Sequence, residues 1–289
     1  NHSHIFVDLV LTSNSLFSLD NFDGELRFRN LGNADEFTQK TSHIFEIMRL
    51  DSASSRYDDM LSEYFSKLFD FEGKLPAAFT VYPDAELNFI PFAALIKPNG
   101  HFLIEDHYVS IGYNSFQEDE SSVQENLFHI VKPTYPSPIA YAANERDELW
   151  KLAYADEEVK GVQESIEGDV SVKENISKQQ FLKLLIKGGN IHFAGHAVST
   201  NDLSFLALAS DSASFLYNTE IAAARSNVNL IVLSACETGA GRLDRGNGLR
   251  SLSRSFLTGG AKTVVSSLWK ANDQAASQLM QSFYKHFSE

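Results

Sequence analysis

Two short, mostly apolar runs near the start of the chain, separated by turn-forming residues, are typical of β-strands. Residues 5–11 and 15–19 show this pattern, and the turn-forming residues 12–14 separate them, so we predict two strands joined by a short turn. Apolar side chains recur mostly at helical spacing over residues 35–49 and 57–71, which predicts two amphipathic helices. The other elements predicted in this half are a buried strand over 77–83 and, over 87–96 and 101–113, further strands with a short helix.

The second half of the chain alternates helical and strand patterns. In chain order, the pattern predicts helices over 144–167 and 178–186, a strand over 190–195, a helix over 219–225, a strand over 229–235, a helix over 249–257, a strand over 261–269 and a helix over 273–287. Strands that alternate with helices favour parallel pairing, because each helix carries the chain back across the sheet. We therefore predict an α/β fold with a mostly parallel sheet flanked by helices.

The segment between the two halves has the composition of a linker. Residues 115–125 are acidic and rich in serine, and Pro133, Pro136 and Pro138 follow them closely. Such clusters mark loops and domain junctions. We therefore place a linker at about 115–138, and we predict an N-terminal subdomain over 1–138 and a C-terminal subdomain over 139–289.

Charge and cysteine content limit the partners and the compartment. The chain of 289 residues has 24 basic and 38 acidic side chains, a formal net charge of -14. This charge disfavours nucleic acid and anionic membranes as direct partners, and no apolar run approaches the roughly 20 residues of a spanning helix. A single cysteine excludes internal disulfides, which fits a reducing cytoplasm. The sequence lacks an initiator Met and stops inside a predicted helix, so we expect it to be part of a longer protein.

Two reactive residues follow apolar strands of the second half. His196 comes after the predicted strand at 190–195, and Cys236 comes after the one at 229–235. If these strands are neighbours in a parallel sheet, both side chains emerge at the same edge, where functional groups of such sheets collect. Their separation, 236 − 196 = 40 residues, is comparable with the roughly 50 residues between His and Cys in caspases.

The pair makes chemical sense as a nucleophile and its base. A thiol is mostly neutral at pH 7 and only the thiolate attacks well, so an imidazole that removes its proton activates it. The backbone N–H groups of Cys236 and Ala197 could then form an oxyanion hole. The alternative is that Cys236 is a small core residue and that His196 is a hydrogen-bonded structural group, and spacing does not decide between these interpretations.

Five blocks of sequence resemble the CHAT family (caspase HetF associated with tetratricopeptide repeats), within the group that includes caspases, separase and gingipains. The resemblance runs from about residue 75 to the end. The blocks are VYPDAELNFIPFAALI, LAYADEEVKGV, NIHFAGHAV, LIVLSACETGAG and the segment from SFLTGGAKTVV to the C-terminus. They occur in the order in which the family has them.

The resemblance implies a caspase-like fold and a cysteine endopeptidase that cleaves a protein substrate. It places the nucleophile at Cys236 and the base at His196, and it implies a structural role for His192. It also implies that the first half is a degenerate caspase-like unit, that no cofactor is needed, and that a sensor domain or activator protein, such as one with tetratricopeptide repeats, regulates the activity. Such repeats are not found in this sequence. A bacterial signalling or defence pathway is the implied setting.

Three further residues are candidates for substrate binding. Asp273 lies in LWKAND, which is similar to a stretch of separase in which an aspartate contacts a basic P1 side chain. By that similarity Asp273 and Trp269 could form an S1 pocket for Arg or Lys. The alternative for Asp273 is a helix N-cap, since it lies at the start of the last predicted helix. Glu237, next to the nucleophile, could line the site or simply be solvated.

Three other functions compete with that of a peptidase. The glycines at 239, 241 and 246 follow a strand, but their spacing is one residue too long for a dinucleotide fingerprint. His192 and His196 are four residues apart, but in a strand and loop rather than on a helix, so we predict no metal site. The serious alternative is a catalytically silent caspase-like adaptor, against which the intact pair of Cys236 and His196 argues.

Overall fold

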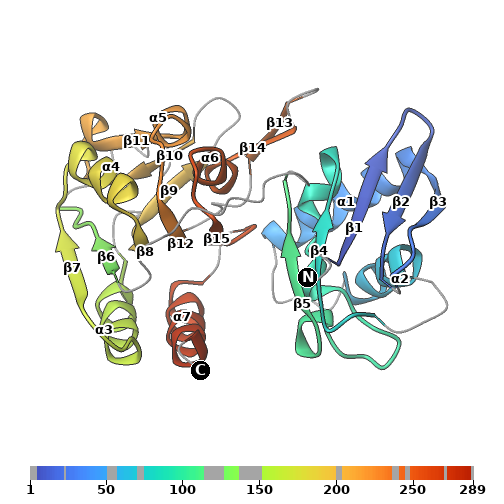
Figure 1. Cartoon of the computed structure of the whole chain (residues 1–289), viewed down its shortest axis with the longest axis horizontal. Helices are drawn as coiled ribbons and strands as arrows, with labels where there is room; N and C mark the ends of the chain where they lie inside the picture. Colours follow the sequence, from blue (N-terminus) through green and yellow to red (C-terminus); the bar gives the residue numbers. More distant parts are fainter. Residues whose placement is uncertain are drawn as a thin grey trace. The chain divides into compact units, whose positions relative to one another are not determined.

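The computed structural model describes residues 5–22, 24–50, 57–69, 75–113, 127–136, 152–199, 204–235, 241–244, 248–269 and 272–287. The chain divides into two compact units, each with its own sheet (Figure 1). The N-terminal unit holds Asn1–Asp119 and Leu243–Leu249, and the C-terminal unit holds Glu120–Arg242 and Arg250–Glu289. Much of the predicted linker at 115–138, namely 115–126 and 137–138, lies outside the described residues.

A five-stranded mixed sheet forms the N-terminal unit. Its strands lie in the order β3 (Arg27–Asn33), β2 (Ser15–Asp20), β1 (Phe6–Leu11), β4 (Ala78–Tyr82) and β5 (Tyr108–Ile111). β1, β2 and β3 pair in antiparallel fashion, whereas β1, β4 and β5 are parallel. The helices of this unit are α1 (Ala34–Leu50) and α2 (Asp58–Phe69), and three short 3₁₀ helices over Ala85–Phe89, Phe92–Ala94 and Leu103–Glu105 replace part of the predicted strands.

Strand β3 was not predicted from the sequence. Its charged residues face inward and its aromatic residue faces solvent, the reverse of the usual arrangement. The carboxylate of Asp20 is fully buried, and Arg27 and Arg29 of β3 lie 3.4 Å and 3.6 Å from it. Phe28 lies between the two arginines in sequence, is 68% exposed, and stacks on Phe17 with ring centroids 5.1 Å apart. The arginines therefore compensate a buried charge, which would otherwise be costly.

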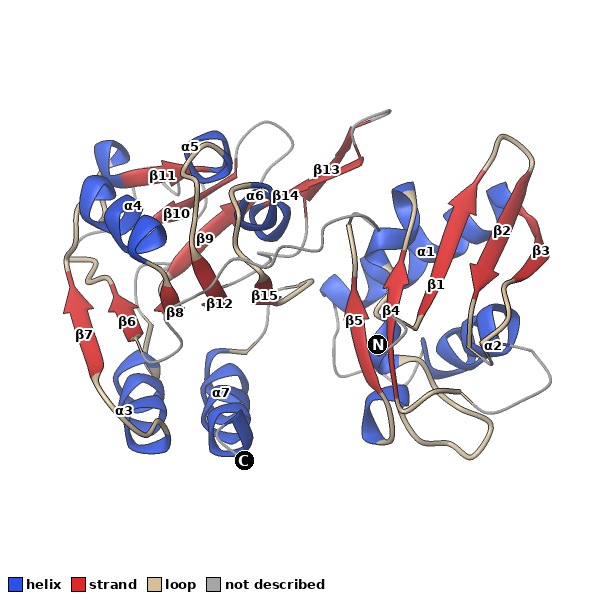
Figure 2. Ribbon diagram, viewed as in Figure 1, coloured by secondary structure: helices blue, strands red, loops and turns tan. Residues whose placement is uncertain are grey.

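A five-stranded sheet, parallel throughout, forms the core of the C-terminal unit (Figure 2). Its order is β15 (Thr263–Ser266), β12 (Val228–Ser234), β8 (Gly189–Ala194), β6 (Phe128–Lys132) and β7 (Val170–Glu174). The predicted α/β class, with a parallel sheet flanked by helices, is confirmed. β6 lies in the range assigned to the linker, and neither β6 nor β7 was predicted.

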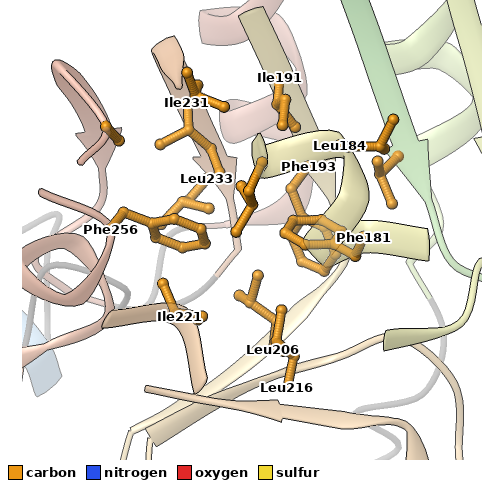
Figure 3. Close-up of a cluster of buried hydrophobic side chains, with 14 of the residues drawn as sticks. Phe181, Leu184, Ile191, Phe193, Leu206, Leu216, Ile221, Ile231, Leu233 and Phe256 are labelled. Carbon is orange, nitrogen blue, oxygen red and sulfur yellow. The ribbon is translucent and has the colours of Figure 1, made fainter. Parts of the chain in front are cut away.

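Helices cover both faces of this sheet. On one face, α4 (Lys178–Lys187), α5 (Asn218–Ala222) and α6 (Leu252–Thr258) pack their apolar side chains against alternate residues of β8 and β12, as Figure 3 shows. On the other face lie α3 (Ala155–Ser165) and α7 (Asp273–Phe287), which pack against each other. The labelled members of the first cluster are Phe181, Leu184, Ile191, Phe193, Leu206, Leu216, Ile221, Ile231, Leu233 and Phe256.

A small antiparallel sheet follows β8 directly. It consists of β9 (His196–Ser199), β10 (Ser204–Ala207) and β11 (Phe215–Tyr217), with β10 in the centre. Phe205 and Phe215 stack with ring centroids 4.2 Å apart. Strands β13 (Gly241–Asp244) and β14 (Gly248–Ser251) form a separate two-stranded sheet. Within the described ranges, no helix combines the length and the apolar character that crossing a membrane requires.

His129 of β6 makes the stability of the C-terminal unit depend on pH. Its side chain is 4% exposed, and burial, together with the charges of Lys187 and Lys173, lowers its pKa. The unfolded state therefore binds the proton more readily, so the stabilisation is present above the ordinary His pKa and is lost as the pH falls through the folded value. We expect the free energy of unfolding to fall from pH 7 to pH 5, and to fall less in His129→Leu. Denaturant titrations over this range measure both slopes, and equal slopes would contradict the assignment.

Candidate active site

The strands that precede the two predicted reactive positions, β8 and β12, end at the same edge of the sheet. These strands are neighbours, as the sequence analysis required, and their last paired residues are Ala194 and Ser234. His196 and Cys236 each come two residues after these partners in sequence. Neighbouring strands lie about 4.8 Å apart, so the two segments leave the sheet side by side. Cys236 itself, and Glu237, lie outside the described residues.

Two hydrogen bonds fix the backbone at this edge. The N–H of Gly195 donates to the carbonyl oxygen of Ser234 over 3.4 Å, which extends the pairing of β8 and β12 by one step. The hydroxyl of Ser267, just after β15, donates to the carbonyl oxygen of Ala235 over 2.9 Å. Each of the last two carbonyl groups before Cys236 is therefore hydrogen-bonded to a neighbouring segment.

Gly195 leaves room that a side chain would fill. A Cβ atom at this position would lie 2.5 Å from Cζ of Phe193 and 2.9 Å from the hydroxyl oxygen of Tyr135. Both distances are shorter than van der Waals contact, so the glycine permits these two aromatic side chains to approach the backbone just before His196.

His196 is the first residue of β9 and is 9% exposed. Its backbone N–H donates to the hydroxyl of Tyr135 over 2.9 Å, and the same hydroxyl donates to the carbonyl oxygen of Ala207 over 2.7 Å. The centroid of the Tyr135 ring lies 4.8 Å from that of the imidazole. Tyr135 was not among the predicted site residues, since it lies between two prolines in the predicted linker.

Ala197, the predicted second donor of an oxyanion hole, lies within β9. It pairs with Leu206 of β10, and its side chain is partly buried against the cluster shown in Figure 3. Its position next to His196 keeps it near the edge where the two segments emerge.

Asp273 and Trp269 lie on the segment that leaves β15 and enters α7. The carboxylate of Asp273 accepts a hydrogen bond of 3.1 Å from the backbone N–H of Tyr154, just before α3. The cap of α7 is instead Asn272, whose side-chain oxygen accepts the N–H of Ala275 over 3.1 Å. The interpretation of Asp273 as the N-cap is therefore wrong by one residue. Trp269 is half-buried.

His192 occupies the opposite face of β8 from the cluster of Figure 3. It is fully buried; its Nε2 lies 2.9 Å from the Glu158 carboxylate of α3 and its Nδ1 lies 3.2 Å from the Tyr284 hydroxyl of α7. Burial and the nearby Glu158 charge raise the pKa of Tyr284, so its phenol stays neutral. This arrangement agrees with the structural role predicted for His192.

Comparison with known proteins gives a family and distant structural likenesses. The CHAT domain family matches residues 63–289. A search of curated proteins gives no match. Among solved structures, the complex of Porphyromonas gingivalis RgpB pro- and mature domains is similar, with a TM-score of 0.46 and 10% sequence identity. That similarity covers 88% of this chain, and this chain spans 66% of the other. The family match extends over more than half of the length of this chain. The chain therefore belongs to the CHAT domain family.

Proposed function

We propose that this chain is a cysteine endopeptidase, with Cys236 as the nucleophile and His196 as its general base. The observation that carries the proposal is the register of β8 and β12, in which the two residues follow directly paired positions by the same two steps. Membership of the CHAT domain family supports the same assignment. We further propose that a protein outside this sequence, or a further domain, regulates the activity.

The proposed reaction uses both residues in both of its stages. His196 takes the proton of the Cys236 thiol, and the thiolate attacks the carbonyl carbon of the scissile peptide bond. The N–H groups of Cys236 and Ala197 are proposed to stabilise the oxyanion that forms. The imidazolium then protonates the leaving amine, which leaves a thioester. Water, deprotonated by the imidazole, hydrolyses the thioester and restores the thiol.

A peptide panel varied at P1 tests this proposal. The single cysteine of the chain makes a thiol reagent specific for Cys236, so iodoacetamide should stop cleavage in proportion to the fraction alkylated. Cleavage that persists after complete alkylation would remove the mechanism. Absence of cleavage over the whole panel, together with a Cys236 alkylation rate that is the same with and without His196, would favour the catalytically silent adaptor.

Asp273 is proposed to select a basic P1 side chain, with Trp269 as a wall of the pocket. We expect Asp273→Asn to lower the preference for Arg over a neutral P1 residue about tenfold. The charged carboxylate that would accept from the Arg guanidinium is replaced by a neutral amide, which is a weaker partner for a cation. The asparagine oxygen can still accept the N–H of Tyr154, so the contact between α3 and α7 is preserved. Relative kcat/KM values for paired Arg and neutral substrates measure the change.

The matched control for this prediction is Asn272→Ala. It removes the side-chain cap of α7 at a cost of about 1 kcal/mol but leaves the carboxylate in place. Its P1 preference should equal that of the native chain. If Asp273→Asn also kept the native preference, the pocket would have to be assigned to other residues.

A further inference from the structure

We propose that Tyr135 is a positioning residue for His196, which it holds through a hydroxyl bridge to β10 and through contact between the two rings. This inference rests on the proposed function, because it assigns to Tyr135 the task of orienting the general base. Tyr135 itself is not proposed to touch the substrate or the reacting atoms.

The bridge joins two facing strands at the first residue of β9. His196 and Ala207 are partners in the pairing of β9 with β10. The Tyr135 hydroxyl accepts the N–H of the first and donates to the carbonyl oxygen of the second. Burial raises the pKa of the Tyr135 phenol, so the hydroxyl keeps the proton that it donates. A phenylalanine could perform neither task.

The aromatic ring adds a second restraint. The centroids of Tyr135 and His196 are 4.8 Å apart with an angle of 55° between the ring planes, which is within the range of favourable aromatic pairs. The ring is held in turn by the stacked pair of Phe205 and Phe215, with which it forms one buried cluster. The imidazole therefore packs against a Tyr135 ring that its buried neighbours hold in place.

The position of Tyr135 in the chain explains how it reaches the site. It comes three residues after β6 ends at Lys132, and β6 is the other neighbour of β8. Tyr135 and His196 thus follow two adjacent parallel strands, β6 and β8, at the same edge of the sheet. Gly195 supplies the space, since a Cβ there would lie 2.9 Å from the Tyr135 hydroxyl.

The test compares two variants. Each removes one buried tyrosine hydroxyl that contacts a histidine, either His196 or His192. Tyr135→Phe removes the hydroxyl bound to the His196 backbone. Tyr284→Phe removes the hydroxyl near Nδ1 of His192, on the opposite face of the sheet, and serves as the matched control for the loss of stability. Two quantities are measured at a temperature at which each chain is folded: the pH dependence of Cys236 alkylation by iodoacetamide, and kcat and KM for a cleaved peptide.

We expect Tyr135→Phe to shift the alkylation profile toward that of His196→Ala and to lower kcat about tenfold with KM unchanged, because a misplaced base weakens general-base catalysis but not substrate binding. Tyr284→Phe should keep the native profile and the native kcat. A native profile and kcat in Tyr135→Phe, with His196→Ala clearly altered, would overturn the inference and leave the proposed dyad standing. A profile that is the same in the native chain and in His196→Ala would overturn the dyad, and the inference with it.

Amide hydrogen exchange in the native chain gives a measurement that needs no variant. The His196 N–H is bonded to a buried hydroxyl, so its exchange should be as slow as that of the paired residues of β10. Exchange at the rate of an exposed amide would contradict the bridge even if Tyr135→Phe failed to fold.

Discussion

Replacing Cys236 by alanine is expected to reduce peptide cleavage to the background rate while the chain still unfolds at the native temperature. The variant removes the only thiol in the sequence, and alanine has no group that can form an acyl-enzyme. We expect His196→Ala to lower kcat/KM by about 10²–10⁴-fold, the usual contribution of a general base. Cleavage of the best peptide of the P1 panel, followed by mass spectrometry, measures both effects.

The design of this experiment separates catalysis from folding. His286, exposed near the end of α7, provides the control, since His286→Ala should retain the native kcat/KM. The double variant of Cys236 and His196 should be no slower than Cys236→Ala alone, because residues that act as one unit are not additive. Undiminished proteolysis by Cys236→Ala would show that the nucleophile lies elsewhere.

Glu158→Ala is expected to destabilise the C-terminal unit by about 1–3 kcal/mol, the usual cost of leaving a buried hydrogen-bonding group without its partner. Glu158 is 3% exposed, and His192 and Tyr284, which lie beside it, are fully buried. Its loss leaves Nε2 of His192 without the acceptor that lies 2.9 Å away and opens a cavity between α3 and α7. Denaturant unfolding, monitored by circular dichroism at pH 7, measures the change.

Two further variants test whether the loss of stability in Glu158→Ala comes from the contact with His192. Glu157→Ala changes the preceding residue of α3, which is exposed, and should alter the free energy of unfolding by less than about 0.5 kcal/mol. Glu158→Gln keeps an acceptor for the imidazole and should lose less stability than Glu158→Ala. If Glu157→Ala and Glu158→Ala had equal effects, the cluster around His192 would contribute nothing to stability.

The parallel sheet was predictable from sequence because its central strands are apolar on both faces. In β12, Ile231 and Leu233 pack toward α4–α6, whereas Leu230 and Val232 pack toward α3 and α7. The resulting continuous apolar run, with a helix pattern on either side, indicates a buried parallel strand. The helix that begins at Asp273 was also placed with the bounds that the structure has.

The features that were missed are ones that hydrophobic periodicity does not encode. The inward positions of β3 hold arginines because Asp20 lies on the neighbouring strand, and periodicity of hydrophobic residues does not detect such pairing. Tyr135 lies in a proline-rich stretch with the composition of a loop, and its contacts are with residues 61 and 72 positions later in the chain. The cap of α7 was misplaced by one residue because both Asn and Asp are good caps and only the structure distinguishes them.

The tight fit around Gly195 limits which residues can occupy positions 135, 193 and 195 together. A Cβ atom at 195 would lie 2.9 Å from the hydroxyl oxygen of Tyr135 and 2.5 Å from Cζ of Phe193, so any larger residue there would displace both aromatic side chains. A side chain at 195 would therefore need smaller residues at both 135 and 193. Among homologues, a residue other than glycine at 195 is expected only together with smaller residues at those two positions.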